Sequence, residues 1–151
     1  MAVEALKGNG NNLSSEVWWS PNHPFKSSLT GMSAKALADA YQNASGKQWT
    51  QPIGFIHALF EVAVDVMKRS PDVGDNKAIV KAIAATNLNS VVGHIEWANQ
   101  KLPPFAQKNI AKTPLVGGQW RLRDGSKYEI VIIDNKTAPM IPVGGKMEAI
   151  G

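Results

Sequence analysis

The sequence predicts an α/β fold. Three consecutive segments in the middle of the chain, at 33–45, 50–70 and 75–85, carry apolar residues at the three- and four-residue steps of a helix. Short runs with strand character precede and follow these segments. With 151 residues and 44% apolar composition, the chain is about one domain long and can form a globular core.

The chain before the first long helix predicts one short helix and one strand. Residues 3–7 are typical of the last turns of a helix that ends at Gly8-Asn9-Gly10, because glycine readily adopts the left-handed conformation of a helix C-cap. Residues 16–20 are short and aromatic and are followed by Pro21. They predict a strand that continues into an extended segment.

The first long helix has recognisable ends. Ser33 can cap its start, and Ser45-Gly46 can end it. Four of its residues share the face that we expect to be buried, namely Ala34, Leu37, Ala38 and Tyr41.

The central helix is the only long apolar run of the chain. Thr50 or Gln51 can cap its start, and Pro52 suits its first turn because the missing N–H would have no partner there. Lys68 and Arg69 lie favourably at the negative end of the helix dipole. We therefore expect this helix to be buried. One face collects seven apolar residues: Ile53, Ile56, Leu59, Phe60, Ala63, Val66 and Met67.

The third helix is expected to start at Asp75, whose side chain can cap it. Residues 90–97 then predict a further strand, and a long loop follows as far as residue 114. The inward residues of the third helix are expected to be Ile79, Val80, Ile83 and Ala84.

The last third of the chain predicts a hairpin. Residues 119–123 and 127–133 flank Asp124-Gly125, a pair that readily takes the positive φ angles of a tight turn. The tail from Asn135 is rich in proline and glycine and is predicted to be irregular. Helices with one wide apolar face normally cover a sheet, yet only about four short strands are predicted and none lies between the three helices. The sheet that these helices need is therefore missing from the prediction.

Two stretches carry a family resemblance. The first is GFIHALFEVAVDVMKR in the central helix, and the second is the pair of VVGHIEW and GGQW, together with the distance between them in this sequence. With the order of elements around them, the chain resembles the C-terminal portion of type I periplasmic substrate-binding proteins. The branch is that of the branched-chain amino acid (Leu-Ile-Val-binding-like) ABC transporters. The resemblance covers nearly the whole chain.

The resemblance implies a two-lobe Rossmann-like fold. Residues 1–20 would end lobe two, and residues 21–114 would provide the closing helices and a strand of lobe one. Residues 115–151 would return to lobe two with the hairpin and the irregular tail. The first strands and helices of both lobes are not matched. We therefore expect the chain to be incomplete, a fragment or truncation whose missing N-terminal part supplies the sheet over the central helix.

The function that the resemblance implies is solute binding for an ABC importer. The solute would be an amino acid or a similar small polar molecule, and the partners would be the missing N-terminal part and the ABC permease. An isolated fragment could also form a domain-swapped oligomer. The implied location is periplasmic, or extracellular with a membrane anchor. The first twelve residues lack the basic region and apolar core of a secretory signal peptide, so the location depends on the resemblance alone.

The candidate ligand-binding residues are aromatic or lie beside an aromatic residue. The resemblance places Phe55 at the cleft, next to Gly54, where backbone can approach a ligand closely; a core position is the alternative for Phe55. Trp18 and Trp19 alternate across a strand, so one can face the core while the other faces the cleft. His23 lies in the extended crossover and can reach a ligand carboxylate or lie in solvent.

No catalytic or metal-binding constellation is predicted. His57 and Glu61, four residues apart on the central helix, are expected to form a surface pair, and His94 and Glu96 to form a second one. The three histidines show no metal spacing, since His57 and Glu61 lack a third ligand nearby. Glu61 and Asp65 are expected at the charged rim of the central helix. We therefore expect no cofactor and no enzymatic activity.

The composition of the chain limits which other functions the sequence allows. The absence of cysteine excludes disulfides, thiolate metal sites and cysteine catalysis. The formal charge is +4, but no run of basic residues exceeds two, so neither a nucleic-acid patch nor a membrane patch is indicated. Three alternatives stay open: a sensor of amides or urea with the same fold, a small hydrolase that uses His57 or His94, and a nucleic-acid module suggested only by five tryptophans and a basic pI.

Overall fold

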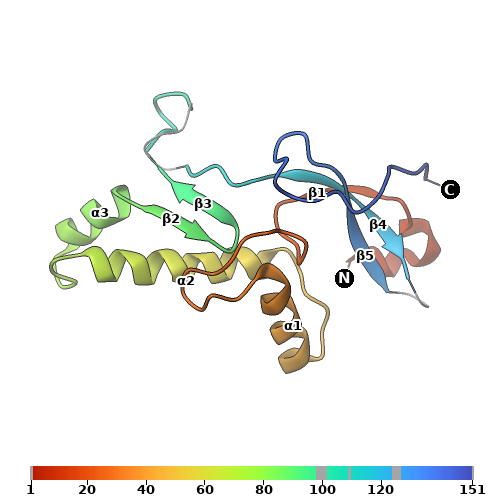
Figure 1. Ribbon diagram of the computed structural model, residues 1–151, viewed down its shortest axis with the longest axis horizontal. Helices are drawn as coiled ribbons and strands as arrows, with labels where there is room; N and C mark the ends of the chain where they lie inside the picture. The colour runs from red at the N-terminus through yellow and green to blue at the C-terminus, as the bar shows by residue number, and fades with distance from the viewer. Residues whose placement is uncertain (1, 98–101, 109, 124–126, 151) are drawn as a thin grey trace.

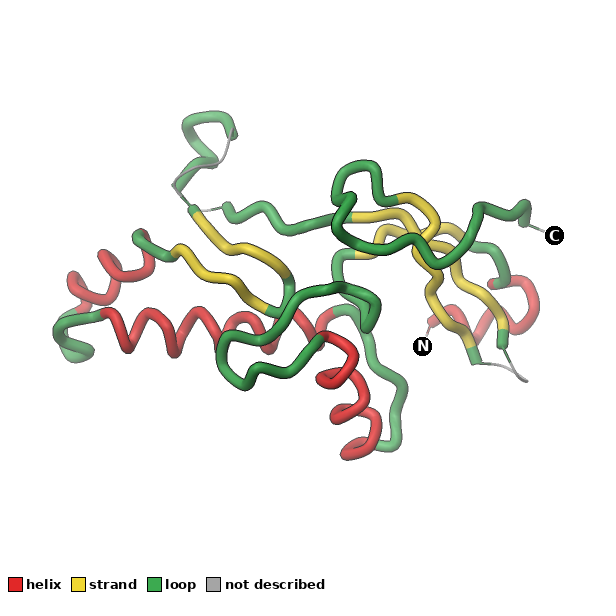
Figure 2. The backbone as a smooth tube through the Cα atoms, viewed as in Figure 1, coloured by secondary structure: helices red, strands yellow, loops and turns green. Residues whose placement is uncertain are grey.

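The computed structural model describes residues 2–97, 102–108, 110–123 and 127–150 (Figures 1 and 2). The protein is a mixed α/β structure with antiparallel sheets. Its elements in chain order are the 3₁₀ helix η1 (Ala2–Gly10), β1 (Ser14–Val17), α1 (Ala34–Ser45), α2 (Pro52–Arg69), α3 (Asn76–Ala84), β2 (Asn87–Ser90), β3 (Gly93–Glu96), β4 (Val116–Leu122) and β5 (Tyr128–Asp134).

The described elements form two parts that lie side by side along the long axis of the molecule (Figure 1). One part holds α2, α3 and the two-stranded β2–β3 hairpin, with α1 near the start of α2. The other part holds the three-stranded antiparallel sheet in the order β1-β4-β5, with η1 and the C-terminal tail against it. The chain passes between the two parts twice, once after β1 and once before β4.

The core lies where the two parts meet. Strand residues such as Ile130 and Ile132 pack in one cluster with helix residues such as Ala38 and Ala58, so the two parts share their interior. The buried members of this cluster are Val17, Trp19, Ala34, Ala38, Trp49, Ala58, Val91, Val92, Ile95, Val116, Ile130, Ile132, Ala138 and Ile141.

The predicted helix ends are confirmed where capping side chains define them. The Ser33 hydroxyl accepts a hydrogen bond from the Ala36 N–H at 3.1 Å, and Gly46 ends α1 with a left-handed φ of 67°. Asp75 caps α3 by accepting from the Lys77 N–H at 2.9 Å. The β4–β5 pairing is also confirmed, although the predicted turn residues Asp124 and Gly125 lie outside the described residues.

The first strand starts two residues earlier than predicted and ends three residues earlier. It ends at Val17 rather than Ser20, because the next two backbone N–H groups, of Trp18 and Trp19, donate to the side-chain oxygen of Gln51 at 2.8 and 3.4 Å. The Gln51 side chain is therefore engaged with the first strand region and makes no capping hydrogen bond to α2.

Two other predicted elements differ in form. The strand expected at 90–97 is confirmed only for β3, because Ser90 ends β2 and the two strands form a hairpin, in which Gly93 adopts a φ of 109° that favours glycine. The N-terminal helix is a 3₁₀ helix that is interrupted at Lys7, whose φ of 51° and ψ of −132° are not helical, one residue before the predicted end at Gly8.

Helix α3 buries less than its periodicity predicts. Val80, Ile83 and Ala84 are exposed, and Ala82 is its only buried residue. In the part of the chain that the structure describes, α2 is the main neighbour of α3, so the other side of α3 stays open to solvent.

Helix α2 leaves most of its apolar face uncovered. Leu59 is 69% exposed and Phe60 is 63% exposed, and Ile56 and Met67 are also exposed. The expectation of a buried helix is therefore not met by the described part of this chain. Among the described residues, no strand covers this face of α2.

Candidate functional site

The structure brings Trp18 and Phe55 together. Trp18 directly follows β1, and Phe55 lies in the first turns of α2. Their ring centroids are 5.0 Å apart with an interplanar angle of 69°, an edge-to-face contact. Both rings are half-buried, and the Gln51 side chain fixes the Trp18 backbone. Two candidate residues thus form one aromatic pair at the junction of the two parts.

Trp19, unlike the half-buried Trp18 beside it, is fully buried. Its ring meets the Trp49 ring edge to face, with the two ring centroids 5.9 Å apart. It also lies directly against Gly54, where an added Cβ would come within 2.3 Å of the indole. The space beside Gly54 is therefore filled by Trp19, so this glycine serves packing and not the approach of a ligand.

His23 is buried instead of reaching into a cleft or into solvent. Its Nδ1 accepts the Ser20 N–H at 3.1 Å and lies 3.0 Å from the Ser20 hydroxyl. Burial lowers the pKa of His23 to about 4, because the charged imidazolium would lose its water. A neutral, locally bonded histidine is not placed to bind a ligand carboxylate.

The expected His57–Glu61 surface pair does not form. His57 Nε2 lies 2.7 Å from the Ser27 hydroxyl. That hydroxyl also accepts the N–H groups of Leu29 and Thr30, each at 3.1 Å. Ser27 is buried, and its hydroxyl holds its own loop through these contacts.

Glu61 is the residue that sequence reasoning placed most wrongly. It was expected at a charged rim, yet it is 1% exposed. Its carboxylate accepts the N–H and hydroxyl of Ser28, the latter at 2.9 Å, and the Val91 N–H at 3.0 Å. Glu61 thus ties the 27–30 loop and the β2–β3 turn to α2. We call these contacts the Glu61 clamp.

The remaining charged residues of interest lie at the surface. Asp65 pairs with Arg69 at 2.6 Å. His94 lies 3.6 Å from Glu96, as predicted, and also bonds the Asn89 side chain at 2.9 Å. No group of three or more potential metal ligands occurs among the residues that the structure describes.

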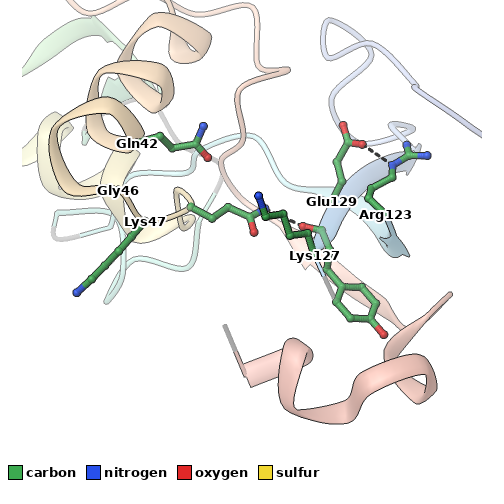
Figure 3. Close-up of a pocket in the computed structure, with 8 residues that line it drawn as sticks. Gln42, Gly46, Lys47, Arg123, Lys127 and Glu129 are labelled. Atoms are coloured by element: carbon green, nitrogen blue, oxygen red, sulfur yellow. Dashed lines mark hydrogen bonds and ion pairs between the residues drawn. The ribbon is translucent and has the colours of Figure 1, made fainter. Parts of the chain in front are cut away.

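A cavity of about 550 Å³ lies between the end of α1 and the β4–β5 hairpin (Figure 3). The side chain of Gln48, one of the lining residues, donates to the Tyr128 carbonyl at 2.7 Å, and Arg123 pairs with Glu129 at 2.8 Å. None of the candidate residues predicted from sequence lines this cavity. Its lining residues are Gln42, Gly46, Lys47, Gln48, Arg123, Lys127, Tyr128 and Glu129.

Comparison of the sequence with protein-family models and with curated proteins gives no match. Among the described residues, no helix combines the length and the apolar character that crossing a bilayer requires. Three structural features bear on function: the Trp18–Phe55 pair, the Glu61 clamp and the uncovered face of α2.

Proposed function

We propose that this chain is the C-terminal part of a type I periplasmic solute-binding protein of an ABC importer. The whole protein would bind an amino acid or a similar small polar solute between two lobes. The observation that carries this proposal is the contact between Trp18 and Phe55, two half-buried rings that meet at the junction of the two described parts. Partly exposed aromatic side chains at such junctions are typical of small-molecule sites.

The arrangement of the two parts supports the same proposal. The connections after β1 and before β4 lie where the family resemblance expects the chain to cross between lobes. In a two-lobed receptor, ligand contacts on both lobes make the closed state favourable, and closure requires such connections to bend. The permease would recognise the closed shape.

The uncovered face of α2 supports the proposal that a further portion of polypeptide packs on this helix. Four of its side chains, those of Ile56, Leu59, Phe60 and Met67, are more than half exposed. Covering them with a sheet would stabilise the assembly by about 1 kcal/mol each, before the entropy cost of docking. In this proposal the first portion of the same protein supplies that sheet, and the protein acts in the periplasm or at the outer surface of the cell.

Calorimetric titration with amino acids tests the proposal. It compares the 151-residue chain with the product of a reading frame that includes the proposed first portion. The longer protein is expected to bind an amino acid with micromolar affinity. The chain alone is expected not to do so, because the first portion would carry most contacts to the amino and carboxylate groups.

A matched pair of variants locates the site in the longer protein. Phe55→Ala is expected to weaken binding about tenfold, since it removes one buried aromatic contact, whereas Phe105→Ala, far from the junction, leaves binding unchanged. Three results would contradict the proposal. The reading frame could lack the first portion, or the chain alone could bind an amino acid tightly. The third result is an equal change in affinity for Phe55→Ala and Phe105→Ala.

A further inference from the structure

The C-terminal tail contacts the β1-β4-β5 sheet without forming a strand of its own. Residues 146–150 belong to no helix or strand, and all five are exposed (Figure 2). Met147 is 71% exposed and Ile150 is 63% exposed, so burial of these two apolar side chains does not hold the segment. Hydrogen bonds from side chains of the sheet region to the tail backbone hold it instead.

Gln119 holds one residue of the tail by both of its backbone groups. It lies in β4, the central strand of the sheet, and is 2% exposed. Its Oε1 accepts the Glu148 N–H and its Nε2 donates to the Glu148 carbonyl, both at 2.9 Å. A residue of a β-strand pairs with a neighbouring strand through the same two groups. The Gln119 side chain therefore binds the tail as a strand edge would, although β4 already has a strand on each side.

Two further side chains hold carbonyl groups on either side of Glu148. Asn12 Nδ2 donates to the Ala149 carbonyl at 2.7 Å, and Arg121 Nη2 donates to the Lys146 carbonyl at 2.7 Å. The exposed Glu148 carboxylate also lies 3.5 Å from Arg121, but an ion pair with an exposed partner contributes little. The three side chains therefore bind the tail mainly by its backbone and depend little on its side chains.

Contacts within the body of the protein orient this set of donors. Arg121 Nη1 donates to Asn12 Oδ1 at 2.6 Å and to Gln119 Oε1 at 2.9 Å, and Gln119 Nε2 donates to the Asn12 carbonyl at 2.8 Å. Asn12 also adopts a left-handed φ of 63°, which is uncommon outside glycine. None of these contacts involves the tail. The two side-chain amides are therefore oriented for a peptide backbone by the protein itself, and such preorganisation favours binding.

We propose that Asn12, Gln119 and Arg121 form a binding site for an extended peptide, and that residues 146–149 occupy it as a tethered ligand. The site presents three donors and one acceptor to a peptide backbone, and backbone hydrogen bonds supply the affinity when sheets bind extended segments. Because the contacts depend little on side chains, a second extended peptide can replace the tail. The tail thus keeps the site occupied until another segment displaces it. This proposal does not depend on the solute-binding proposal.

A spin label on the tail tests the proposal in the 151-residue chain. The chain has no cysteine, so Met147→Cys provides a single labelling site at an exposed side chain. Electron paramagnetic resonance is expected to show restricted motion of the label. A peptide with the sequence of residues 146–151, added in trans, is expected to release the labelled tail, with half release at about the millimolar effective concentration of a tethered segment. The same peptide, N-methylated at the position of Glu148, cannot donate to Gln119 and is expected to leave the label restricted.

Two substitutions at one exposed position of the labelled chain provide the matched control. Glu148→Pro removes the N–H that Gln119 accepts and is expected to make the label as mobile as on a free peptide. Glu148→Ala keeps this N–H and is expected to leave the label restricted. Position 148 is exposed, so neither change disturbs the core.

Three results would overturn the proposal: a mobile label before any further substitution, equal mobility in the two variants, or equal release by the two peptides. Dilution identifies the source of the bound segment. A label that stays restricted at every protein concentration supports the tail of the same chain as the occupant. Release on dilution, with dimers in analytical ultracentrifugation at higher concentration, supports the same peptide site with the tail of a second copy as its occupant.

Discussion

Replacing Glu61 by glutamine tests the clamp that joins α2 to the 27–30 loop and to the β2–β3 turn. The substitution keeps the size and shape of the side chain, so it opens no cavity. It changes one carboxylate oxygen into an NH₂ donor. The new amide can still accept from Ser28 with its remaining oxygen, but its NH₂ group then faces the Val91 N–H, a second donor.

The magnitude follows from the number and type of these hydrogen bonds. Bonds to a charged acceptor contribute about 1.5–3 kcal/mol each, and leaving a buried donor unpaired costs a comparable amount. Glu61→Gln loses one such bond outright and weakens two others, so we expect a loss of about 2 kcal/mol in the free energy of unfolding. For a chain of this length, that loss lowers Tm by about 6 °C.

Thermal unfolding followed by circular dichroism measures the change, and amide hydrogen exchange locates it. Exchange at Ser28 and Val91 is expected to accelerate in Glu61→Gln. The matched control is Asp65→Asn, one turn along α2, which breaks only the exposed pair with Arg69 and is expected to lower Tm by no more than about 2 °C.

Two results would refute this reasoning about the clamp. One is a Glu61→Gln variant with the Tm of the unmodified chain. The other is a loss of stability with unchanged exchange at Ser28 and Val91, because the destabilisation would then come from elsewhere in the molecule.

Two further substitutions test packing and protonation. Gly54→Ala is expected to lower the free energy of unfolding, measured with denaturant, by about 2 kcal/mol, because its Cβ would lie 2.3 Å from the Trp19 ring. The control is Gly8→Ala, which has open space around it and is expected to change this free energy by less than about 0.5 kcal/mol. Similar values for both variants would show that the Trp19 contact is unimportant. Burial lowers the pKa of His23 from 6.5 to about 4, so the unfolded chain binds the proton first as the pH falls. Stability is therefore expected to be constant above about pH 6.5 and to fall toward pH 4, by at most about 3 kcal/mol. His23→Asn should flatten this profile, and an unchanged profile would exclude His23 as its source.

Local signals predicted the helices well. Ser33 and Asp75 cap their helices as expected, and Gly46 ends α1 in the left-handed conformation. Each of these interactions joins residues within four positions, so the sequence contains both partners of the contact. The β4–β5 pairing was predictable for the same reason, since its two strands are close neighbours in the chain.

Contacts between residues far apart in the sequence determine the features that local signals did not predict. Periodicity places Glu61 at the edge of the apolar face of α2, but its burial depends on Ser28 and Val91, which are 33 and 30 residues away. Strand β1 stops early because Gln51, more than thirty residues later, takes the next two N–H groups. No local pattern in the sequence contains these pairings.

The candidate site was predicted in part. Of two adjacent tryptophans, one was expected to face the core and the other the ligand cleft; the structure buries Trp19 and pairs Trp18 with Phe55. It did not anticipate that Trp19 fills the space beside Gly54 or that Ser20 holds His23. Both outcomes depend on how the segment after β1 lies against α2, which composition and spacing do not specify.

Side-chain footprinting of α2 tests most directly whether another portion of polypeptide covers this helix. Carbene labelling of Leu59 and Phe60 is compared between the 151-residue chain and the protein purified from the cells that make it. We expect heavy labelling in the isolated chain, where both side chains are exposed, and strong protection in the protein from cells. Equal labelling in the two samples would contradict the proposal that this chain is one portion of a two-lobed receptor.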